Sequence, residues 1–429
     1  METLANTKPH RIGFVSTRLA GTDGVSLETE KWARVLTYLN CECFYFAGES
    51  DWPEECSYTV EEAHFNHPEI QALNADLFDN YQRSSKTSGE VQKIRFYLKE
   101  HLYQFVRKFD IELLIIENAL SIPMNIPLGL ALTELIAETN LPTIAHHHDF
   151  AWERQRFKVS AAVDYQWGAF PPMLPSVQHV IINSYAARQL ALRTGISSIL
   201  IPNVMDFDNP PPEPDEYAKD LRDELGINLD EYLLLQPTRV VPRKRIERAV
   251  ELARRLERPS ALLISHASGD EGTAYEAYLQ EYAELMGVKV IFAAGRIEYH
   301  RGETHDGQKI YSLRDVYQQA NLVTYPSTVE GFGNAFLEAI YYRRPVVIST
   351  YEIYRRDIQP KGFRVIEFGD FITEDTVLEA REVLSDPALA VEMSEINYEL
   401  GRRHYSDRIL ESQLSTLLHA CLGFKIEHS

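Results

Sequence analysis

Residues 322–339 read LVTYPSTVEGFGNAFLEA, and this stretch decides the fold. The apolar residues 322–325 are typical of a buried strand, and a helix is expected to begin near residue 335. The loop between them contains Gly331 and Gly333, which let the backbone approach a ligand closely. Free N–H groups at the start of the helix favour a diphosphate. The stretch therefore predicts a strand, a loop that contacts a phosphorylated ligand, and a helix.

Two carboxylates lie at different depths of this predicted site. Glu330 is in the loop, and Glu338 is about one turn into the helix. Carboxylates placed in this way can accept hydrogen bonds from hydroxyl groups at two ends of an extended polyol. The same residues also allow a surface loop in which Asn334 caps the helix and Glu338 is solvated.

The rest of the chain alternates between strand-like and helical patterns, which predicts an α/β fold with two doubly wound parallel sheets. Four prolines in residues 209–214 mark the boundary between them. The expected helices include residues 89–109, 127–139, 245–256, 273–286 and 335–342. The expected strands are residues 11–16, 43–47, 113–117, 143–148, 179–183, 198–202, 232–236, 261–265, 288–293, 322–325 and 345–349.

Composition limits the classes of function. The 429 residues carry a net charge of −20, which argues against a nucleic-acid-binding surface but allows a small anionic substrate in a basic cleft. No apolar run is long enough to span a bilayer, and residues 1–10 lack a signal-peptide pattern. The four cysteines, Cys41, Cys43, Cys56 and Cys421, have no metal-site spacing. A cytoplasmic protein without nucleic-acid or membrane partners is expected.

The segment from Glu330 to Glu338 resembles the Glu-x7-Glu motif of retaining GT-B glycosyltransferases of family 4, the glycogen synthase and sucrose synthase-like superfamily. Residues 236–245, QPTRVVPRKR, are similar to the Arg-x4-Lys segment of that family, with Arg239 and Lys244 at the matching positions. Fixed cations of this kind stabilise a departing diphosphate. The resemblance covers most of the C-terminal half closely and the N-terminal half only in outline.

The resemblance implies two Rossmann-like domains that face an interdomain cleft. Residues 1–203 would form the acceptor domain, joined by a C-terminal helix at about 405–429, and residues 204–404 would bind the nucleotide sugar. The first glutamate would contact the donor sugar and the second the ribose. The residues expected to bind the donor are Arg239, Lys244, Glu330, Gly331, Phe332, Gly333, Asn334, Ala335, Glu338 and Gly24.

The loop after the first strand contains Gly21, Asp23 and Gly24. It lacks the dinucleotide fingerprint, which argues against a nicotinamide-dependent dehydrogenase. In the family that the chain resembles, the corresponding loop approaches the donor phosphate and the acceptor. Gly21, Asp23 and Arg18 are therefore candidates for acceptor contacts.

Residues 143–154 read TIAHHHDFAWER, and period-two alternation places His146 and His148 on one face of a strand. The family places a histidine after this strand near the reacting centre, and two registers compete, one selecting His146 and the other the His148–Asp149 pair. A metal site and a hydrogen-bonded strand end are the alternatives. The candidate catalytic residues are thus His148, His146, Asp149 and Glu330. The residues expected to line the acceptor pocket are Trp152, Arg154 and Arg156, and at least one of these arginines is expected to form a structural ion pair instead.

One segment departs from the family pattern. Residues 351–357, YEIYRRD, stand where a Gly-Gly-x-x-Glu segment is usual. The resemblance implies retaining transfer of a hexosyl group from a nucleotide sugar, with UDP-glucose favoured over GDP-mannose, to a small polar acceptor such as a sugar or a glycerate-like acid. No catalytic metal or other cofactor is expected, and a homo-oligomer is compatible with the sequence. The alternatives are a disaccharide phosphorylase of the trehalose phosphorylase type and a non-catalytic nucleotide-sugar binder.

Overall fold

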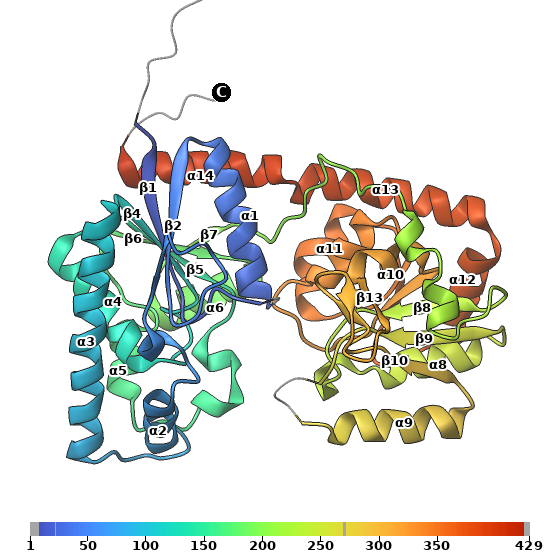
Figure 1. Cartoon of the computed structure of the whole chain (residues 1–429), viewed down its shortest axis with the longest axis horizontal. Helices are drawn as coiled ribbons and strands as arrows, with labels where there is room; N and C mark the ends of the chain where they lie inside the picture. The colour runs from blue at the N-terminus through green and yellow to red at the C-terminus, as the bar shows by residue number, and fades with distance from the viewer. Residues whose placement is uncertain (1–7, 22, 269–271, 424–429) are drawn as a thin grey trace, which may run out of the picture. The chain divides into compact units, whose positions relative to one another are not determined.

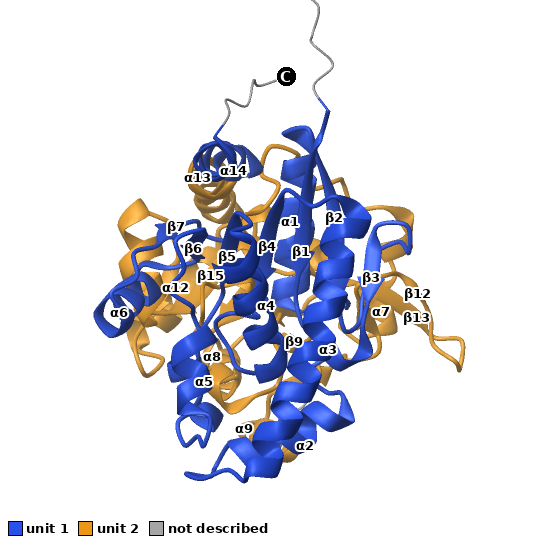
Figure 2. Ribbon diagram, turned by 90° about the vertical axis from the view of Figure 1, so that its left-hand side faces the viewer, with its two compact units in different colours: residues 1–203, 407–429 blue, residues 204–406 orange. Residues whose placement is uncertain are grey.

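The computed structural model describes residues 8–21, 23–268 and 272–423. The chain divides into two compact units, coloured separately in Figure 2. Unit 1 comprises Met1–Asn203 and Asp407–Ser429, and unit 2 comprises Val204–Ser406. Each unit contains a parallel sheet covered by helices, so the predicted α/β class is confirmed.

The sheet of unit 1 has seven strands, all of them parallel (Figure 1). They are β1 (His10–Val15), β2 (Cys41–Ala47), β3 (Ser57–Thr59), β4 (Leu113–Glu117), β5 (Thr143–His147), β6 (Val177–Ile181) and β7 (Ile199–Leu200). Their order is β3-β2-β1-β4-β5-β6-β7. Every residue of β4 is buried, as expected where helices cover both faces of a parallel sheet.

Seven α-helices of unit 1 are described. They are α1 (Gly24–Tyr38), α2 (Pro68–Leu77), α3 (Ser85–Phe109), α4 (Ile126–Thr139), α5 (Val163–Ala169), α6 (Ser184–Thr194) and α14 (Asp407–Leu422). Side chains from α2, α3, α4 and α5 form the main core against one face of the sheet. Helices α1 and α14 pack against each other, and Arg34 of α1 donates to Asp407 of α14 at 2.6 Å. Trp32 of α1 stacks on His146 of β5, so α1 covers the other face.

The main sheet of unit 2 has six parallel strands in the order β10-β9-β8-β14-β15-β16. In chain order these are β8 (Tyr232–Gln236), β9 (Ser260–Ile264), β10 (Lys289–Phe292), β14 (Leu322–Tyr325), β15 (Val346–Ser349) and β16 (Ile366–Phe368). A separate small sheet contains β11 (Ile297–Glu298), β12 (Gly302–Glu303) and β13 (Lys309–Ser312).

Helices cover this six-stranded sheet as well. Side chains of α8 (Glu247–Arg255), α9 (Ala274–Met286), α12 (Glu374–Ser385) and α13 (Pro387–Tyr405) share one core with the strands. The short α7 (Leu221–Glu224) precedes β8, and α10 (Leu313–Gln319) and α11 (Asn334–Tyr341) flank β14 in the chain. None of the helices among the described residues is long and apolar enough to cross a membrane.

Several elements were not expected from the sequence. These are β3, α2, α5, α7, the small sheet and β16, most of which are short or carry no clear periodicity. The strand expected at residues 198–202 is reduced to Ile199–Leu200. The sequence pattern predicts a helix over residues 388–398, and α13 covers Pro387–Tyr405.

Candidate functional site

The loop after β14 is shaped by Gly333 and Tyr351. Gly333 has a φ of +128°, a conformation that L side chains rarely adopt. A Cβ atom there would lie 2.5 Å from the Tyr351 hydroxyl, which donates a 2.8 Å hydrogen bond to the carbonyl of Phe332. Tyr351, the first residue of the segment that departs from the family pattern, thus fixes the turn that leads into α11.

A buried ion pair joins this loop to the turn after β8. The Nζ of Lys244 contacts the Glu330 carboxylate, and the two side chains are 9% and 10% exposed. The Nη1 of Arg243 lies 3.8 Å from the same carboxylate. Thr328 donates from its backbone N at 2.9 Å and its hydroxyl at 3.0 Å to the carbonyl of Arg243. The structure therefore brings together the two segments that the sequence singled out.

Positive charge predominates at this junction. Burial lowers the pKa of Lys244, and the negative charge of Glu330 opposes that effect. Burial also lowers the pKa of His266, and Lys244 and Arg239 add to the decrease, so this imidazole is neutral at pH 7. The Nδ1 of His266 lies 2.7 Å from the hydroxyl of Ser265. With Arg239 exposed, the junction is suited to an anionic ligand.

Glu338 is held by Tyr317 of α10, whose hydroxyl donates a 2.9 Å hydrogen bond to Oε2 of the carboxylate. Burial and the nearby charge of Glu338 raise the pKa of Tyr317 well above its usual range, so the phenol stays protonated. The carboxylate is half-buried and fixed in orientation.

The other residues predicted for the donor site lie in the same loop and at the start of α11. Gly331 is exposed, and Phe332 is buried with its ring edge-on to Tyr405 at a centroid distance of 5.3 Å. Asn334 is half-buried and Ala335 is buried. All of them therefore belong to one short stretch of backbone beside Glu330.

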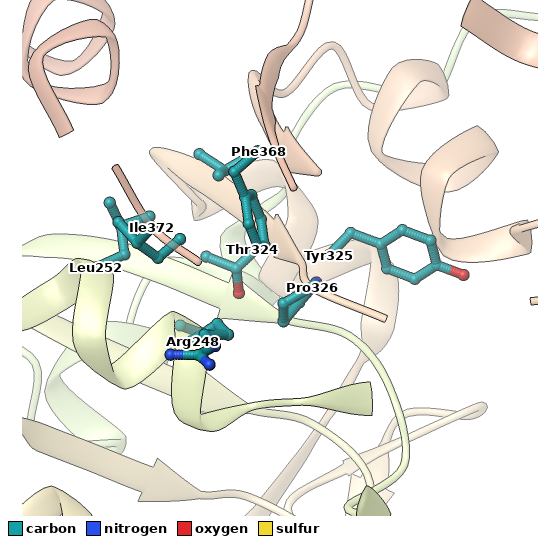
Figure 3. Close-up of a pocket in the computed structure, with 9 residues that line it drawn as sticks. Arg248, Leu252, Thr324, Tyr325, Pro326, Phe368 and Ile372 are labelled. Atoms are coloured by element: carbon teal, nitrogen blue, oxygen red, sulfur yellow. The ribbon is translucent and has the colours of Figure 1, made fainter. Parts of the chain in front are cut away.

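A hollow in unit 2 lies beside this loop, on the α8 side of β14 (Figure 3). Its lining is mostly apolar, and Arg248 is the charged residue in it. Tyr325 points away from the other labelled side chains in Figure 3, and its ring centroid lies 5.5 Å from Lys244 Nζ. The hollow therefore belongs to the packing of α8 against the sheet.

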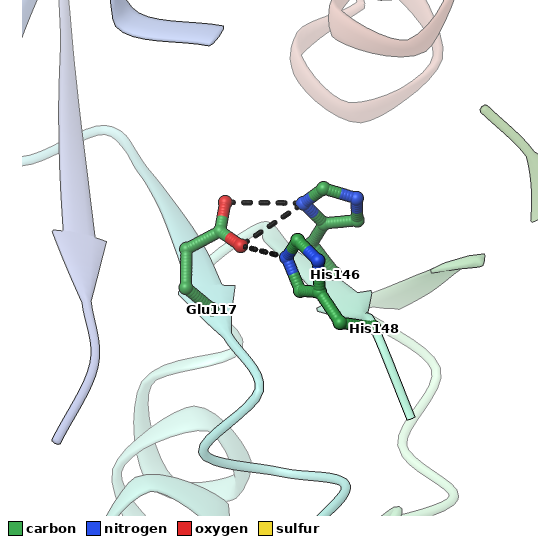
Figure 4. Close-up of side chains that lie close together, drawn as sticks. All are labelled: Glu117, His146 and His148. Carbon is green, nitrogen blue, oxygen red and sulfur yellow. Dashed lines mark hydrogen bonds and ion pairs between the residues drawn. The ribbon is translucent and has the colours of Figure 1, made fainter. Parts of the chain in front are cut away.

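In unit 1, three side chains converge at the ends of β4 and β5 (Figure 4). Glu117 and His146 are paired across the two parallel strands. The Nδ1 of His146 lies 3.0 Å from Glu117 Oε2, and the Nε2 of His148 lies 2.9 Å from the same oxygen. His146 and His148 share one face, as predicted, whereas His147 faces His179 with a ring-nitrogen distance of 2.9 Å.

Burial raises the pKa of Glu117, but the two histidines outweigh this effect and lower it to about 2. The carboxylate is therefore ionised. Burial lowers the pKa of His148, but Glu117 more than compensates and the net shift is upward. The His148 side chain is 10% exposed and that of His146 is 1% exposed, so only the former is accessible to a ligand.

The same three residues could hold a metal ion, because one ligand atom from each lies within 4.8 Å of the others. Two imidazole nitrogens and a carboxylate oxygen are a donor set that suits a divalent transition metal. The interactions between them also satisfy the charges without an ion. The expectation of no catalytic metal stays a prediction.

The segment after β5 holds the catalytic candidate Asp149 and the acceptor candidates Trp152, Arg154 and Arg156. Asp149 accepts a 2.6 Å hydrogen bond from Nε of Arg154 and a 3.0 Å hydrogen bond from the side chain of Asn118. Trp152 stacks on Phe150 at a centroid distance of 4.5 Å. Asp149 and Arg154 thus form an ion pair at the end of β5.

The loop before α1 is organised by Asp23. Its side chain accepts hydrogen bonds from the backbone N of Val25 at 3.0 Å and of Ser26 at 3.3 Å, which caps the helix that begins at Gly24. Arg18 lies 3.0 Å from the same carboxylate, and Gly21 N donates to Asp51 at 2.7 Å. Asp23 therefore has a structural role, whatever it contributes to a ligand.

Residues 218–400 match the family Glycosyl transferases group 1. A mannosylglucosylglycerate synthase of Thermotoga maritima is 34% identical over 443 residues, which cover 94% of this chain and 99% of that protein. The chain is a group 1 glycosyltransferase. A mannosylglucosylglycerate synthase of Petrotoga mobilis is 30% identical, over 88% of this glycosyltransferase and 94% of that protein. The alignment with a solved glycosyltransferase structure from Rickettsia africae covers 97% of this chain and 99% of that chain, with a TM-score of 0.67 at 12% identity. The fold is GT-B.

Four residues at these sites of the glycosyltransferase were missed by the sequence analysis: Glu117, His266, Tyr317 and Tyr351. Glu117 had a usable signal, because it is the acidic residue that ends an otherwise apolar strand. The strand of Glu117, β4, pairs in the sheet with β5, which carries the histidines. Tyr317 had no local signal, because it meets Glu338 only through the tertiary packing of α10 and α11.

Proposed function

We propose that this glycosyltransferase transfers a mannosyl group from a nucleotide-activated mannose to glucosylglycerate. The observation that carries the proposal is the similarity, over most of the chain, to two proteins named for mannosylglucosylglycerate. That name describes a product with mannose attached to glucosylglycerate, so the transfer that completes it adds mannose. UDP-glucose, the donor that the family resemblance favoured, is the competing donor in the test.

We assign the donor to the junction of the two loops in unit 2. Glu330 binds hydroxyl groups of the sugar, and Glu338, oriented by Tyr317, binds the ribose. Lys244 and Arg239 hold the diphosphate together with the backbone around Gly333. The proximity of Lys244 to Glu330 supports this assignment, because the donor sugar and its diphosphate are covalently linked and must be bound side by side.

The reaction breaks the bond between the anomeric carbon and the diphosphate oxygen. A new bond forms between that carbon and an acceptor hydroxyl oxygen, and the hydroxyl proton passes to the leaving diphosphate. Retention of configuration is proposed from the resemblance of residues 330–338 to retaining enzymes. The chain supplies cations that stabilise the negative charge as it develops on the diphosphate.

In unit 1 we assign the substrate contact to His148 rather than His146. The His146 side chain is 1% exposed and is stacked on Trp32 at a centroid distance of 4.2 Å. His148 is accessible, and Glu117 fixes its ring. Its role is to orient the reacting substrates.

The test is direct. The purified protein is incubated with glucosylglycerate and either GDP-mannose or UDP-glucose, and the products are analysed by mass spectrometry and by NMR of the anomeric proton. The expected product forms with GDP-mannose and retains the donor configuration. Product from UDP-glucose alone, or an inverted product, would contradict the proposal. Incubation of the protein with trehalose and phosphate tests for phosphorylase activity, and no turnover is expected.

A further inference from the structure

Three arginines were predicted to contact the acceptor, and two of them are engaged by aspartates. Arg18 lies 3.0 Å from Asp23, which caps α1. Arg154 donates from Nε to Asp149 at 2.6 Å, and Asn118 anchors that carboxylate. The charge of each of these guanidinium groups is therefore balanced within unit 1.

Arg156 differs from both. Among residues 8–21, 23–268 and 272–423, the structure gives Arg156 no ion pair with an acidic side chain. Its guanidinium carbon lies 4.5 Å from the ring centroid of Phe157. Arg156 is exposed. Desolvation lowers the pKa of Arg156, the positive charge of Arg154 adds to the decrease, and the negative charge of Asp149 opposes it. Arg156 is thus an accessible cation that an anionic ligand can reach.

The backbone that carries Arg156 is well anchored. Residues Gln155–Phe157 form a 3-10 turn, and Phe157 N donates to the carbonyl of Arg154 at 3.2 Å. Phe157 is 5% exposed and its ring meets Phe78 edge-on at 4.9 Å. The side chain of Arg156 therefore extends from a fixed base, which limits the entropy lost when it binds a ligand.

The position also suits a ligand contact. Arg156 lies in the segment that follows β5, and ligands of parallel α/β sheets bind beyond the carboxyl ends of the strands. The same segment begins with His148, the accessible histidine of the converging group.

We propose that Arg156 is the specificity residue that binds the carboxylate of the glycerate moiety in the acceptor. This inference rests on the proposed function, in which the acceptor is glucosylglycerate. The planar guanidinium group offers two parallel N–H donors to a carboxylate, which an uncharged glycerol moiety cannot match.

The experiment compares glucosylglycerate with glucosylglycerol, which has the same sugar but no charge. We expect Arg156→Ala to raise the KM for glucosylglycerate about 10- to 100-fold, because a charge-assisted hydrogen bond is lost, and to leave the KM for glucosylglycerol unchanged. Arg156→Lys keeps the charge without the paired donors and should give an intermediate KM. Lys158→Ala, which removes the next cation along the chain, is the matched control and should change neither KM.

The two failures are distinguishable. If the wild-type protein transfers nothing to glucosylglycerate, the proposed function is wrong. If the wild type is active but Arg156→Ala changes both KM values equally or not at all, the role of Arg156 is wrong. Should the alanine variant not fold, as judged by thermal melting, the ratio of the two KM values in Arg156→Lys decides the question.

Discussion

Replacing Lys244 with methionine removes the cation that contacts Glu330. The side chains of this pair are 9% and 10% exposed, so the change leaves a carboxylate in a largely dehydrated position. Breaking a buried ion pair in this way typically costs about 3–5 kcal/mol of folding free energy. Arg243, 3.8 Å from Glu330, remains as a partial substitute, so we expect a loss of about 3 kcal/mol in unit 2.

The effect on stability can be localised to one unit. All four tryptophans, Trp32, Trp52, Trp152 and Trp167, belong to unit 1, whereas far-UV circular dichroism reports on both units. Denaturation of Lys244→Met should therefore show an early transition by circular dichroism that tryptophan fluorescence does not follow. The double variant Lys244→Met/Glu330→Gln removes both charges and should regain most of the lost stability.

Turnover separates a donor role from a structural one. If Lys244 stabilises the leaving diphosphate, its loss should lower kcat by about 10²- to 10³-fold, as removal of a transition-state donor does in other enzymes. The double variant should then be slower than Glu330→Gln alone by a similar factor. Equal rates for those two variants, or near-normal turnover of folded Lys244→Met, would refute the assignment of Lys244 to the diphosphate.

Three further outcomes are expected. Glu338→Ala should weaken donor binding in calorimetry about 10-fold, the loss for one charge-assisted hydrogen bond, and an unchanged Kd would exclude the ribose contact. EDTA should leave turnover intact. A metal requirement would be established if EDTA abolished activity and one divalent ion per chain restored it in the wild type but not in Glu117→Gln. Burial lowers the pKa of His179 from 6.5 to about 4, so the unfolded state binds the proton more readily than the folded state does. The free energy of unfolding of unit 1 should therefore decrease by up to about 3 kcal/mol as the pH falls from 6.5 to 4. Tryptophan fluorescence during acid titration should show this transition at lower pH in His179→Gln, and an unshifted midpoint would exclude His179 as its cause.

The sequence predicted those parts of the fold whose signals are local. The strand, glycine loop and helix around residues 322–341 could be located because the apolar run, the turn residues and the helical spacing follow one another directly. The long α3 was expected from its periodicity, although it begins at Ser85 rather than near residue 89. The small sheet around β13 was missed, because strands of two to four residues show no measurable alternation.

The candidate sites were predictable only in part, for the same reason. Alternation along β5 correctly placed His146 and His148 on one face, but it carries no information about depth. The difference between them arises because Trp32 of α1 covers His146. Glu117 enters the group only because β4 and β5 are neighbours in the sheet. Arg154 pairs with Asp149 of the same segment, and the sequence had left open which arginine would form such an ion pair.

The position of α14 has a consequence for biosynthesis. Unit 1 is discontinuous, because Val204–Ser406 is inserted between β7 and α14. Helix α14 buries Leu410, Leu414, Leu417 and Leu418 and is joined to α1 by the pair of Arg34 with Asp407. A nascent chain on the ribosome thus exposes an apolar face of its first-made unit until the whole of the second has been translated. A circularly permuted chain in which α14 precedes β1 should therefore need less assistance from chaperones to fold.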